Sequence, residues 1–214
     1  MKSEAYRQVA RIGSALGNGS RLELLELIAQ ADQSVDALAS MTGRALTTIS
    51  SHLQVLKAAG LVATRREGTT IFYRLSNDTV AQLVVTLTAV AIDALPELRL
   101  METEPALSGS AAPIPILRSV NDIGDAYVLD VRPGHEYDAG HYPGASSIPL
   151  GELPARFDEV PPGRRVVVYC RGEFCALARD AARLLRARGV DAHAMHEGVL
   201  EWRASGDIAL SATA

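Results

Sequence analysis

The sequence is poor in cysteine, with only Cys170 and Cys175 among 214 residues. A disulfide between two cysteines five positions apart would cross-link the fold only weakly. The sequence therefore excludes a disulfide-rich secreted scaffold and favours a reducing compartment. The chain also lacks a signal-peptide pattern, because Met1-Lys2-Ser3-Glu4 leads into a mixed polar segment with no apolar region behind it. We therefore expect a cytoplasmic protein.

Long hydrophobic runs are absent as well. The most apolar stretch, Val80 to Ile92, is interrupted by Gln82, Thr86 and Thr88 and is too short to span a bilayer. The 48% hydrophobic and 21% charged composition is that of an ordinary globular protein. At this length the chain can form two small domains, each with its own core, and no membrane partner is expected.

The sequence has no excess of positive charge, since its formal net charge is −4. Residues 1–103 contain ten Lys or Arg and ten Asp or Glu, whereas residues 104–214 contain eleven and fifteen. Any contact with a nucleic acid must therefore come from local clusters of basic and polar residues in the neutral first half.

The first half reads as helices followed by a β-hairpin. Helical spacing predicts a broad-faced helix with Ser20 as N-cap, a short helix opened by Ser34, and a helix that ends at Gly60. Pro96 predicts a kink or break in the last helix. The expected helices are 5–16, 21–31, 35–41, 46–59 and 79–101, and the hairpin strands are 61–66 and 69–75.

A stretch rich in Pro, Ser, Gly and Ala follows and reads as a linker at 102–115, which separates domains at 1–101 and 116–214. The second domain alternates strands with helices, which predicts an α/β fold with a parallel sheet and a site at the carboxyl ends of its strands. The expected strands are 127–131, 146–149, 166–169 and 192–195, with helices at 133–139, 153–160 (weak) and 176–188.

The helix at 46–59 is the candidate for reading DNA. Ile49, Leu53 and Leu56 recur at the spacing of a buried face, which leaves short polar groups on or near the outer face, where they can reach bases or phosphates. Arg65-Arg66 precede the hairpin turn and suit a phosphate contact, although a solvated strand end is the alternative. The candidate DNA-binding residues are Thr47, Thr48, Ser50, Ser51, His52, Gln54, Arg65 and Arg66.

Three motifs in this half, Leu16 to Leu22, Ser50 to Val62, and the Arg65-Arg66-Glu67-Gly68 wing ending in Phe72 to Leu75, resemble the ArsR family of bacterial winged helix-turn-helix repressors. The resemblance implies a homodimer, joined through its first and last helices, that binds operator DNA with an inverted repeat. Ser51 departs from the arginine often found there. Residues 35–40 contain no cysteine and residues 79–101 no histidine, so no metal site is expected.

The two cysteines lie in a loop between the strand at 166–169 and the helix at 176–188. Backbone N–H groups and the helix dipole converge at such a place, and both lower the pKa of a thiol. Cys170 begins the loop, so we predict that it is the more reactive thiol. The alternative is that Cys170 and Cys175 are two small apolar residues in a core.

Leu129 to Arg132, Tyr137 to Ala145, Cys170, and Glu197 to Trp202 resemble a single-domain rhodanese over about residues 115–210. The resemblance implies that Cys170 carries a persulfide, taken from a sulfane sulfur donor such as thiosulfate or a small persulfide. It also implies that loop N–H groups cradle the anion and that Arg171 steers the donor. Asp130 and Arg132 are interpreted as a loop-bracing pair, and Trp202 as a core residue.

The loop departs from the rhodanese pattern in three places. Gly172 comes one residue early, Glu173 would repel thiosulfate, and Cys175 stands where a small hydroxyl or an arginine is common. Ala176 in place of a loop-closing arginine argues against phosphoryl or arsenate chemistry. Cys175 instead offers a resolving thiol that could form a disulfide or polysulfide link with Cys170.

The sequence is interpreted as a dimeric transcriptional regulator, a repressor, with a rhodanese-like sensor of sulfane sulfur and no cofactor. The site residues assigned to sulfur chemistry are Cys170, Arg171 and Cys175. Two alternatives stay open: a sulfurtransferase that regulates its own operon, and a dithiol sensor for arsenite or another soft ion, for which two sulfurs leave the coordination incomplete.

Overall fold

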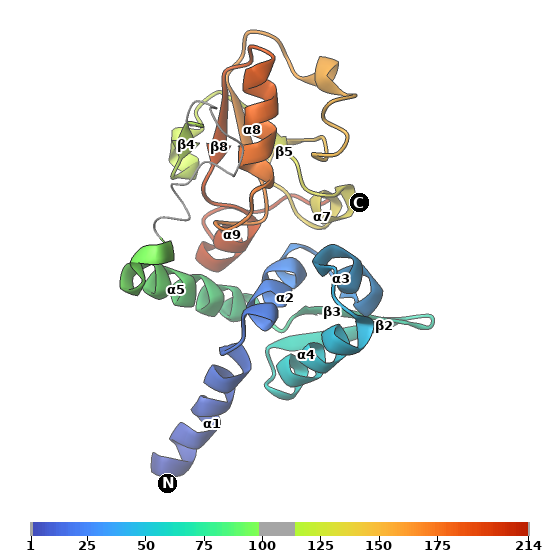
Figure 1. The fold of residues 1–214 in the computed structure, drawn as a ribbon, viewed down its shortest axis with the longest axis vertical. Coiled ribbons are helices and arrows are strands. Elements are labelled where there is room, and N and C mark those ends of the chain that lie inside the picture. The colour runs from blue at the N-terminus through green and yellow to red at the C-terminus, as the bar shows by residue number, and fades with distance from the viewer. Residues whose placement is uncertain (1, 99–113, 214) are drawn as a thin grey trace. The chain divides into compact units, whose positions relative to one another are not determined.

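The computed structural model describes residues 2–98 and 114–213 (Figure 1). The chain packs into two compact units, Met1–Val84 and Val85–Ala214. Most of the linker expected at 102–115 lies outside the described residues, so the domain boundary expected there stays a prediction. No helix within the described ranges is long and apolar enough to cross a membrane.

Residues 2–98 form the predicted order of helices and a hairpin (Figure 1). The sheet is antiparallel, in the order β1-β3-β2, and Gly68 with φ of 58° allows the tight turn between β2 and β3. The helices are α1 (Lys2–Leu16), α2 (Gly19–Gln30), α3 (Val35–Thr42), α4 (Leu46–Ala58) and α5 (Asp78–Ala94), and the strands are β1 (Gln33–Ser34), β2 (Val62–Glu67) and β3 (Thr70–Leu75).

Two helix boundaries test the sequence reading directly. Ser34 caps α3 as expected, accepting a hydrogen bond from Ala37 N at 3.1 Å. The expected cap Ser20 is wrong: Asn18 caps α2, because its Oδ1 accepts from Arg21 N at 3.3 Å and the helix begins at Gly19. α5 ends at Ala94, just before Pro96, where a break was expected.

The core of the winged helix-turn-helix fixes α4 from its inner side. Ile49, Leu53 and Leu56 are fully buried, as their spacing predicted. They belong to a buried apolar set that also includes Leu24, Leu25, Leu38, Leu61, Val62 and Tyr73. This burial leaves the opposite face of α4 toward solvent.

Residues 114–213 form an α/β fold around a five-stranded parallel sheet with the order β4-β8-β7-β5-β6. β7 is central and pairs with β5 and β8, which is why its residues are buried on both faces. The strands are β4 (Ile116–Leu117), β5 (Tyr127–Asp130), β6 (Ser146–Ser147), β7 (Val166–Tyr169) and β8 (Ala192–Met195), and the helices are η1 (Val120–Asp122), α7 (Gly134–Ala139), η2 (Phe157–Glu159), α8 (Leu177–Ala187) and α9 (Val199–Ser205).

Alternate residues of β7 belong to two separate cores. Val166 and Val168 pack in one cluster with Ala178, Ala181, Ala182 and Leu185 of α8. Val167 and Tyr169 pack in the other with Val199 and Trp202 of α9. The sheet is therefore covered by α8 on one face and α9 on the other, and both helices begin near the carboxyl end of β7.

Several elements of this unit differ from expectation, among them β4 and η1, which were not predicted. The weak helix expected at 153–160 is wrong, because its hydrogen bonds close isolated turns: Arg156 N donates to Glu152 O, and Val160 N donates to Phe157 O, both at 3.0 Å. α9 was not predicted, since a helix this short carries little periodicity of its own.

A buried ion pair braces the carboxyl end of β5. Arg132 Nη2 lies 2.6 Å from Asp130 Oδ2, both side chains are fully buried, and Arg132 also donates to Gly140 O at 2.8 Å. The interpretation of Asp130 and Arg132 as a bracing pair fits this geometry. Trp202 is buried, as expected of a core residue.

Asp130→Ala should destabilise the protein by about 3–5 kcal/mol, because it leaves a buried guanidinium without its carboxylate. Denaturant unfolding followed by circular dichroism measures the change. Asp158, an exposed carboxylate in the same unit, supplies the matched control, and its replacement by Ala should stay within about 0.5 kcal/mol. Equal effects of the two substitutions would contradict the bracing role.

Candidate functional site

The outer face of α4 presents the polar residues predicted to read DNA. Thr47, Thr48, Ser51 and Gln54 are exposed, whereas Ser50 and His52 are half-buried. Four of the six candidates on this helix are therefore available to a ligand in the described conformation. Their contacts with DNA stay a prediction.

The wing arginines are already engaged within the protein. Arg65 pairs with Asp32 at 3.1 Å and with Glu67 at 2.7 Å, and its guanidinium lies over the Phe72 ring. Arg65 donates hydrogen bonds to Glu67 and to Asp32, and these bonds raise the pKa of Arg65. Arg66 Nε donates to Gly68 O at 3.0 Å. A phosphate at Arg65 would have to compete with two carboxylates.

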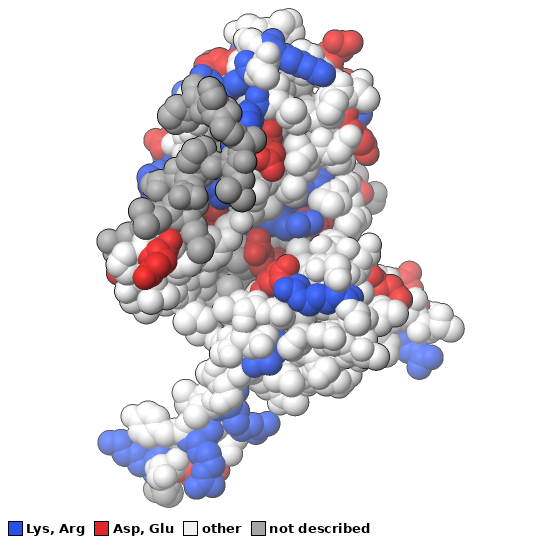
Figure 2. Space-filling view, viewed as in Figure 1, with Lys and Arg blue, Asp and Glu red and all other residues white. Residues whose placement is uncertain are grey.

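Basic side chains do not form one continuous patch on the face in view. Figure 2 shows Lys and Arg interspersed with Asp and Glu there. Positive and negative side chains are therefore mixed on this face and are not separated into patches of one sign.

The thiol loop connects β7 to α8. Cys170 follows Tyr169 directly and is 2% exposed, whereas Cys175 is half-buried. Cys170 Sγ donates to Cys175 O at 3.3 Å. The N–H groups of Gly172 and Ala178 hydrogen-bond to the Cys170 sulfur, and those of Arg171 and Leu177 to the Cys175 sulfur. The loop therefore brings two sulfurs and four backbone donors together.

The two thiols do not ionise alike. Burial raises the pKa of Cys170 well above its ordinary value. The hydrogen bond from Cys170 lowers the pKa of Cys175 to about 6, with help from backbone N–H groups and from the charge of Arg171. Burial thus disfavours negative charge on Cys170, whereas its surroundings favour negative charge on Cys175. The prediction that Cys170 is the more reactive thiol concerns reaction rates and stays a prediction.

Arg171 is held by a carboxylate that the sequence reading missed. Its guanidinium meets the fully buried Glu136 of α7, with Nη2–Oε1 at 2.7 Å and Nε at 3.0 and 3.1 Å from the two oxygens. This fork anchors the loop to α7. Arg171 therefore acts here as a positioning residue, while the role of steering a donor stays a prediction.

Gly198 lets α9 approach the loop. A Cβ at this position would lie 2.5 Å from both Cys170 O and Gly172 N, closer than any side chain can come. Leu200 N also donates to Arg171 O at 3.0 Å. The loop backbone is thus fixed against the start of α9 by a contact that only glycine permits.

Glu201 supplies a second carboxylate at this loop. The sequence analysis included it in the Glu197 to Trp202 motif and predicted no role for it. Its oxygens accept from Gly198 N at 2.7 Å and from Glu173 N at 3.4 Å, and they lie against Gly172. Burial raises the pKa of Glu201 to about 7, because these backbone donors offset only part of the lost hydration. A group that titrates near neutrality therefore touches the thiol loop.

A small pocket opens beside Cys175 and does not include Cys170 among its lining residues. It lies between the loop, α8 and β8, and His196 Nε2 meets Glu173 Oε1 across it at 3.1 Å. The lining residues are Ile116, Glu173, Cys175, Arg179, Ala194, Met195 and His196.

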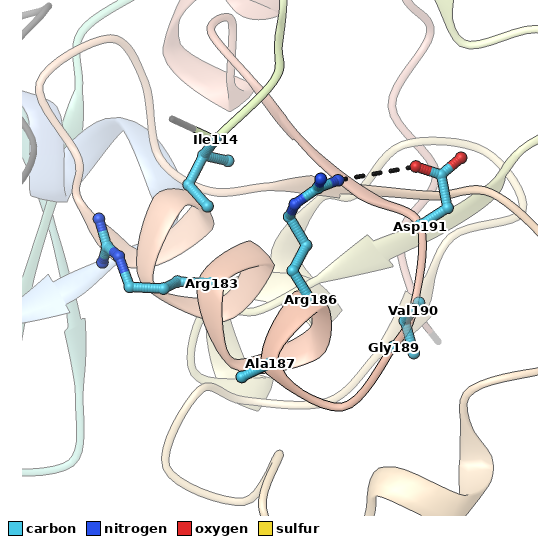
Figure 3. Close-up of a pocket in the computed structure, with 7 residues that line it drawn as sticks. All are labelled: Ile114, Arg183, Arg186, Ala187, Gly189, Val190 and Asp191. Carbon is cyan, nitrogen blue, oxygen red and sulfur yellow. Dashed lines mark ion pairs between the residues drawn. The ribbon is translucent and has the colours of Figure 1, made fainter. Parts of the chain in front are cut away.

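A second pocket lies at the other end of α8 and has no part in the thiol site. Figure 3 shows Arg183 and Arg186 projecting from α8 there. Arg186 Nη1 lies 3.7 Å from Asp191 Oδ1. Cys170 and Cys175 precede the first residue of α8, whereas this pocket surrounds its last turn.

In the described part of the chain, no group of three or more His, Cys, Asp or Glu side chains could hold a metal ion. The thiol pair alone offers a soft ion two sulfurs. Nothing in the described residues completes a third ligand for arsenite.

Gly198→Ala should displace the thiol loop, because its Cβ would overlap the Cys170–Gly172 backbone. We expect a stability loss of about 1–3 kcal/mol and a shift of the Cys175 pKa back toward its ordinary value. The pH dependence of alkylation by iodoacetamide measures that pKa. Gly151, where a Cβ meets nothing within 4 Å, is the matched control for Ala substitution. An unchanged alkylation profile in Gly198→Ala would count against the close approach.

Glu201→Gln should flatten the dependence of stability on pH. The folded pKa of about 7 lies above the ordinary value of 4.5, so the folded state binds more protons between these values and stability falls as pH rises through this window. The loss in wild type should reach up to about 3 kcal/mol, and the variant should lack it. Urea unfolding at a series of pH values provides the measurement, and parallel curves for both proteins would refute the assignment.

Comparison with known proteins supports both halves of this description. The Rhodanese-like domain family matches residues 117–205, and the HVO_A0114 family matches residues 18–76. A protein of Allochromatium vinosum named Sulfurtransferase is 30% identical over 92 residues, which cover 40% of this chain and 78% of that protein.

A solved structure corresponds to the first half. The homodimeric winged helix-turn-helix DNA-binding domain (fragment 1–100) of Mb0332 from Mycobacterium bovis, described as a possible ArsR-family transcriptional regulator, is 48% identical to this chain. The match covers 44% of this chain and 87% of that one, with a TM-score of 0.42.

One relative matches along nearly the whole chain. The HTH-type transcriptional regulator Rv0324 of Mycobacterium tuberculosis is 42% identical over 207 residues, which cover 96% of this chain and 91% of that protein. The resemblances predicted from the sequence are thereby confirmed. This chain belongs to the family of HTH-type transcriptional regulators that includes Rv0324, and it joins a winged helix-turn-helix region to a rhodanese-like domain.

Proposed function

We propose that this protein is a homodimeric repressor whose rhodanese-like domain senses sulfane sulfur at the Cys170–Cys175 pair and changes the affinity of the winged helix-turn-helix for operator DNA. The observation that carries the proposal is the thiol pair itself. Two cysteines lie in one loop between β7 and α8, where Cys170 Sγ donates to Cys175 O at 3.3 Å, in a chain that belongs to a family of transcriptional regulators.

The exposed face of α4 supports binding of DNA. Thr47, Thr48, Ser51 and Gln54 are exposed, and hydroxyl and amide groups of this kind contact phosphates and base edges. Ser50 and His52 border this face, and Arg65 and Arg66 of the wing provide the positive charge. Binding through so few basic residues should depend on salt less steeply than in a protein with a broad basic surface.

Exposed apolar side chains on the first and last helices of residues 2–98 support the homodimer. Tyr6 and Val9 of α1 are 65% and 66% exposed, and Val90 of α5 is 60% exposed. Exposed large apolar side chains such as these favour burial against another protein surface. A second copy of the chain, joined through α1 and α5, would cover them and pair two α4 helices for an inverted repeat.

The thiol loop supports a response to sulfur. A thiolate at Cys175 and a neutral thiol at Cys170 can combine with a sulfane sulfur donor and then with one another. A disulfide or polysulfide link would alter a loop that Glu136 and Gly198 hold in place. A hundredfold loss of DNA affinity requires about 2.7 kcal/mol of coupling between the two regions.

A sulfurtransferase is the second candidate, favoured by the similarity to the protein named Sulfurtransferase. In this alternative the thiol pair would pass sulfur to an acceptor with steady turnover. A sensor would instead load sulfur once per pair and then change its affinity for DNA. Multiple turnovers without any change in DNA binding would favour the enzyme.

Persulfide treatment should weaken operator binding by the wild-type protein about a hundredfold, because modification of the thiol loop favours a conformation with lower affinity for DNA. Fluorescence anisotropy with operator DNA measures the affinity, and intact-protein mass measures sulfur loading in the same samples. The double variant Cys170→Ser, Cys175→Ser is the control and should bind DNA with and without donor alike. Sulfur loading with unchanged DNA affinity would contradict the sensor hypothesis and favour the sulfurtransferase hypothesis.

A further inference from the structure

The two adjacent arginines of the wing lie on opposite faces of the hairpin. β2 and β3 pair antiparallel, with Arg65 opposite Phe72 and Arg66 opposite Ile71. Side chains alternate between the two faces of a strand, so Arg65 shares a face with Phe72, whereas Arg66 shares the other face with Thr64. Two neighbours in the sequence therefore have different surroundings.

The face that holds Arg66 is continuous with the helix predicted to read DNA. Lys57, in the last turn of α4, donates from Nζ to Thr64 Oγ1 at 3.1 Å. Thr64 and Arg66 are two positions apart on β2, so both lie on the side of the hairpin that meets α4. Figure 1 shows the tip of this hairpin projecting past α4. Arg66 thus extends the surface of α4 along the wing.

Arg65 is bound on the opposite face by three groups of the protein. Its Nε lies 3.1 Å from Asp32 Oδ2, its Nη1 lies 2.7 Å from Glu67 Oε2, and its Cζ lies 5.0 Å from the centre of the Phe72 ring. Asp32 precedes β1, 33 positions before Arg65 and outside the hairpin. The pair with Asp32 therefore links the wing to the segment between α2 and β1.

The partner of Arg66 carries no charge. Arg66 Nε donates to the backbone carbonyl of Gly68 at 3.0 Å. A phosphate at Arg66 would not have to compete with the charge of that partner, whereas a phosphate at Arg65 would compete with the negative charges of Asp32 and Glu67. The two arginines therefore differ in the attraction that each offers to DNA.

We propose that Arg65 is a positioning residue, which sets the direction of the wing through its pair with Asp32, and that the wing contacts a DNA phosphate through Arg66. This division of roles rests on the DNA binding proposed above, where both arginines were assigned to the contact. A guanidinium outnumbered by two carboxylates brings no net attraction to a phosphate. It can still fix the angle between two segments that are distant in the sequence.

Salt dependence separates the two roles. The slope of log Kd against log salt falls by about 0.9 for each phosphate contact that is lost, or by about two for a dimer with two wings. Arg66→Gln should show this change, whereas Arg65→Gln should keep the wild-type slope. Arg164→Gln removes an exposed arginine of the other unit and is the matched control, which should change neither the slope nor the affinity.

The titrations use the full-length protein and two fluorescein-labelled duplexes, with fluorescence anisotropy as the readout. One duplex is selected by the wild-type protein from a random pool, and the other has the same composition in scrambled order. Arg66→Gln should weaken binding to both duplexes by a similar factor, because a phosphate contact carries no sequence information.

Asp32→Asn gives results of opposite sign for the two roles of Arg65. If Arg65 positions the wing, loss of its partner should weaken binding to the selected duplex about threefold for each wing, or about tenfold for the dimer. The double variant Arg65→Gln, Asp32→Asn should then bind no more weakly than either single variant, because both changes break one interaction. If Arg65 instead binds phosphate, removal of a competing carboxylate should tighten binding. Asp32→Asn keeps every arginine, so this test stands if Arg65→Gln fails to fold.

The outcomes distinguish this division of roles from the proposed function. Unchanged or tighter binding by Asp32→Asn, or a slope lowered in Arg65→Gln as much as in Arg66→Gln, would overturn the positioning role and leave the proposed function intact. An unchanged slope in Arg66→Gln would overturn its phosphate contact. Failure of the wild-type protein to bind any duplex would overturn the proposed function as well.

Discussion

The close approach of α9 to the backbone after β7 is the constraint on which the thiol site depends. Gly198 meets Cys170 O and Gly172 N at distances that exclude a side chain. The contact fixes the first half of the loop, and Arg171 anchors the same half to Glu136 of α7. With its backbone held at two points, the loop keeps its N–H groups directed at the two sulfurs, which is how a preorganised anion site operates.

The electrostatics of the site follow from that fixed backbone. Negative charge is costly on the buried Cys170 and less costly on Cys175, which receives the hydrogen bond of its neighbour and the field of Arg171. Glu201 lies against the same loop with its pKa raised by burial. Burial and backbone hydrogen bonds thus shift the pKa of two acidic groups at this loop, downward for Cys175 and upward for Glu201.

The sequence predicted the parts of the fold that are set by local pattern. β7 and β8 have the predicted bounds: β7 is a run of β-branched residues ending in Tyr169, and β8 is a short segment between turns. The buried face of α4 follows from the spacing of Ile49, Leu53 and Leu56. Cys170 and Cys175 could be singled out as a pair because they are the two cysteines of the chain.

The remaining parts depend on contacts between distant residues. Glu136 pairs with a residue 35 positions away, and Glu201 accepts from one 28 positions away, so neither carboxylate stands out in its own segment. The relative burial of the two thiols could not be predicted from the sequence either, because it depends on how α8 and α9 pack on the sheet.

Trp202 makes the packing of the rhodanese-like domain observable by fluorescence. It is the single tryptophan of the chain, its ring lies 4.9 Å from that of Tyr169, and Tyr169 is the residue before Cys170. Its indole Nε1 donates to Glu197 Oε2 at 3.3 Å, just before the glycine that touches the loop. The tryptophan emission of the protein is therefore a label-free signal of the environment around the cysteines, and it comes from this domain alone.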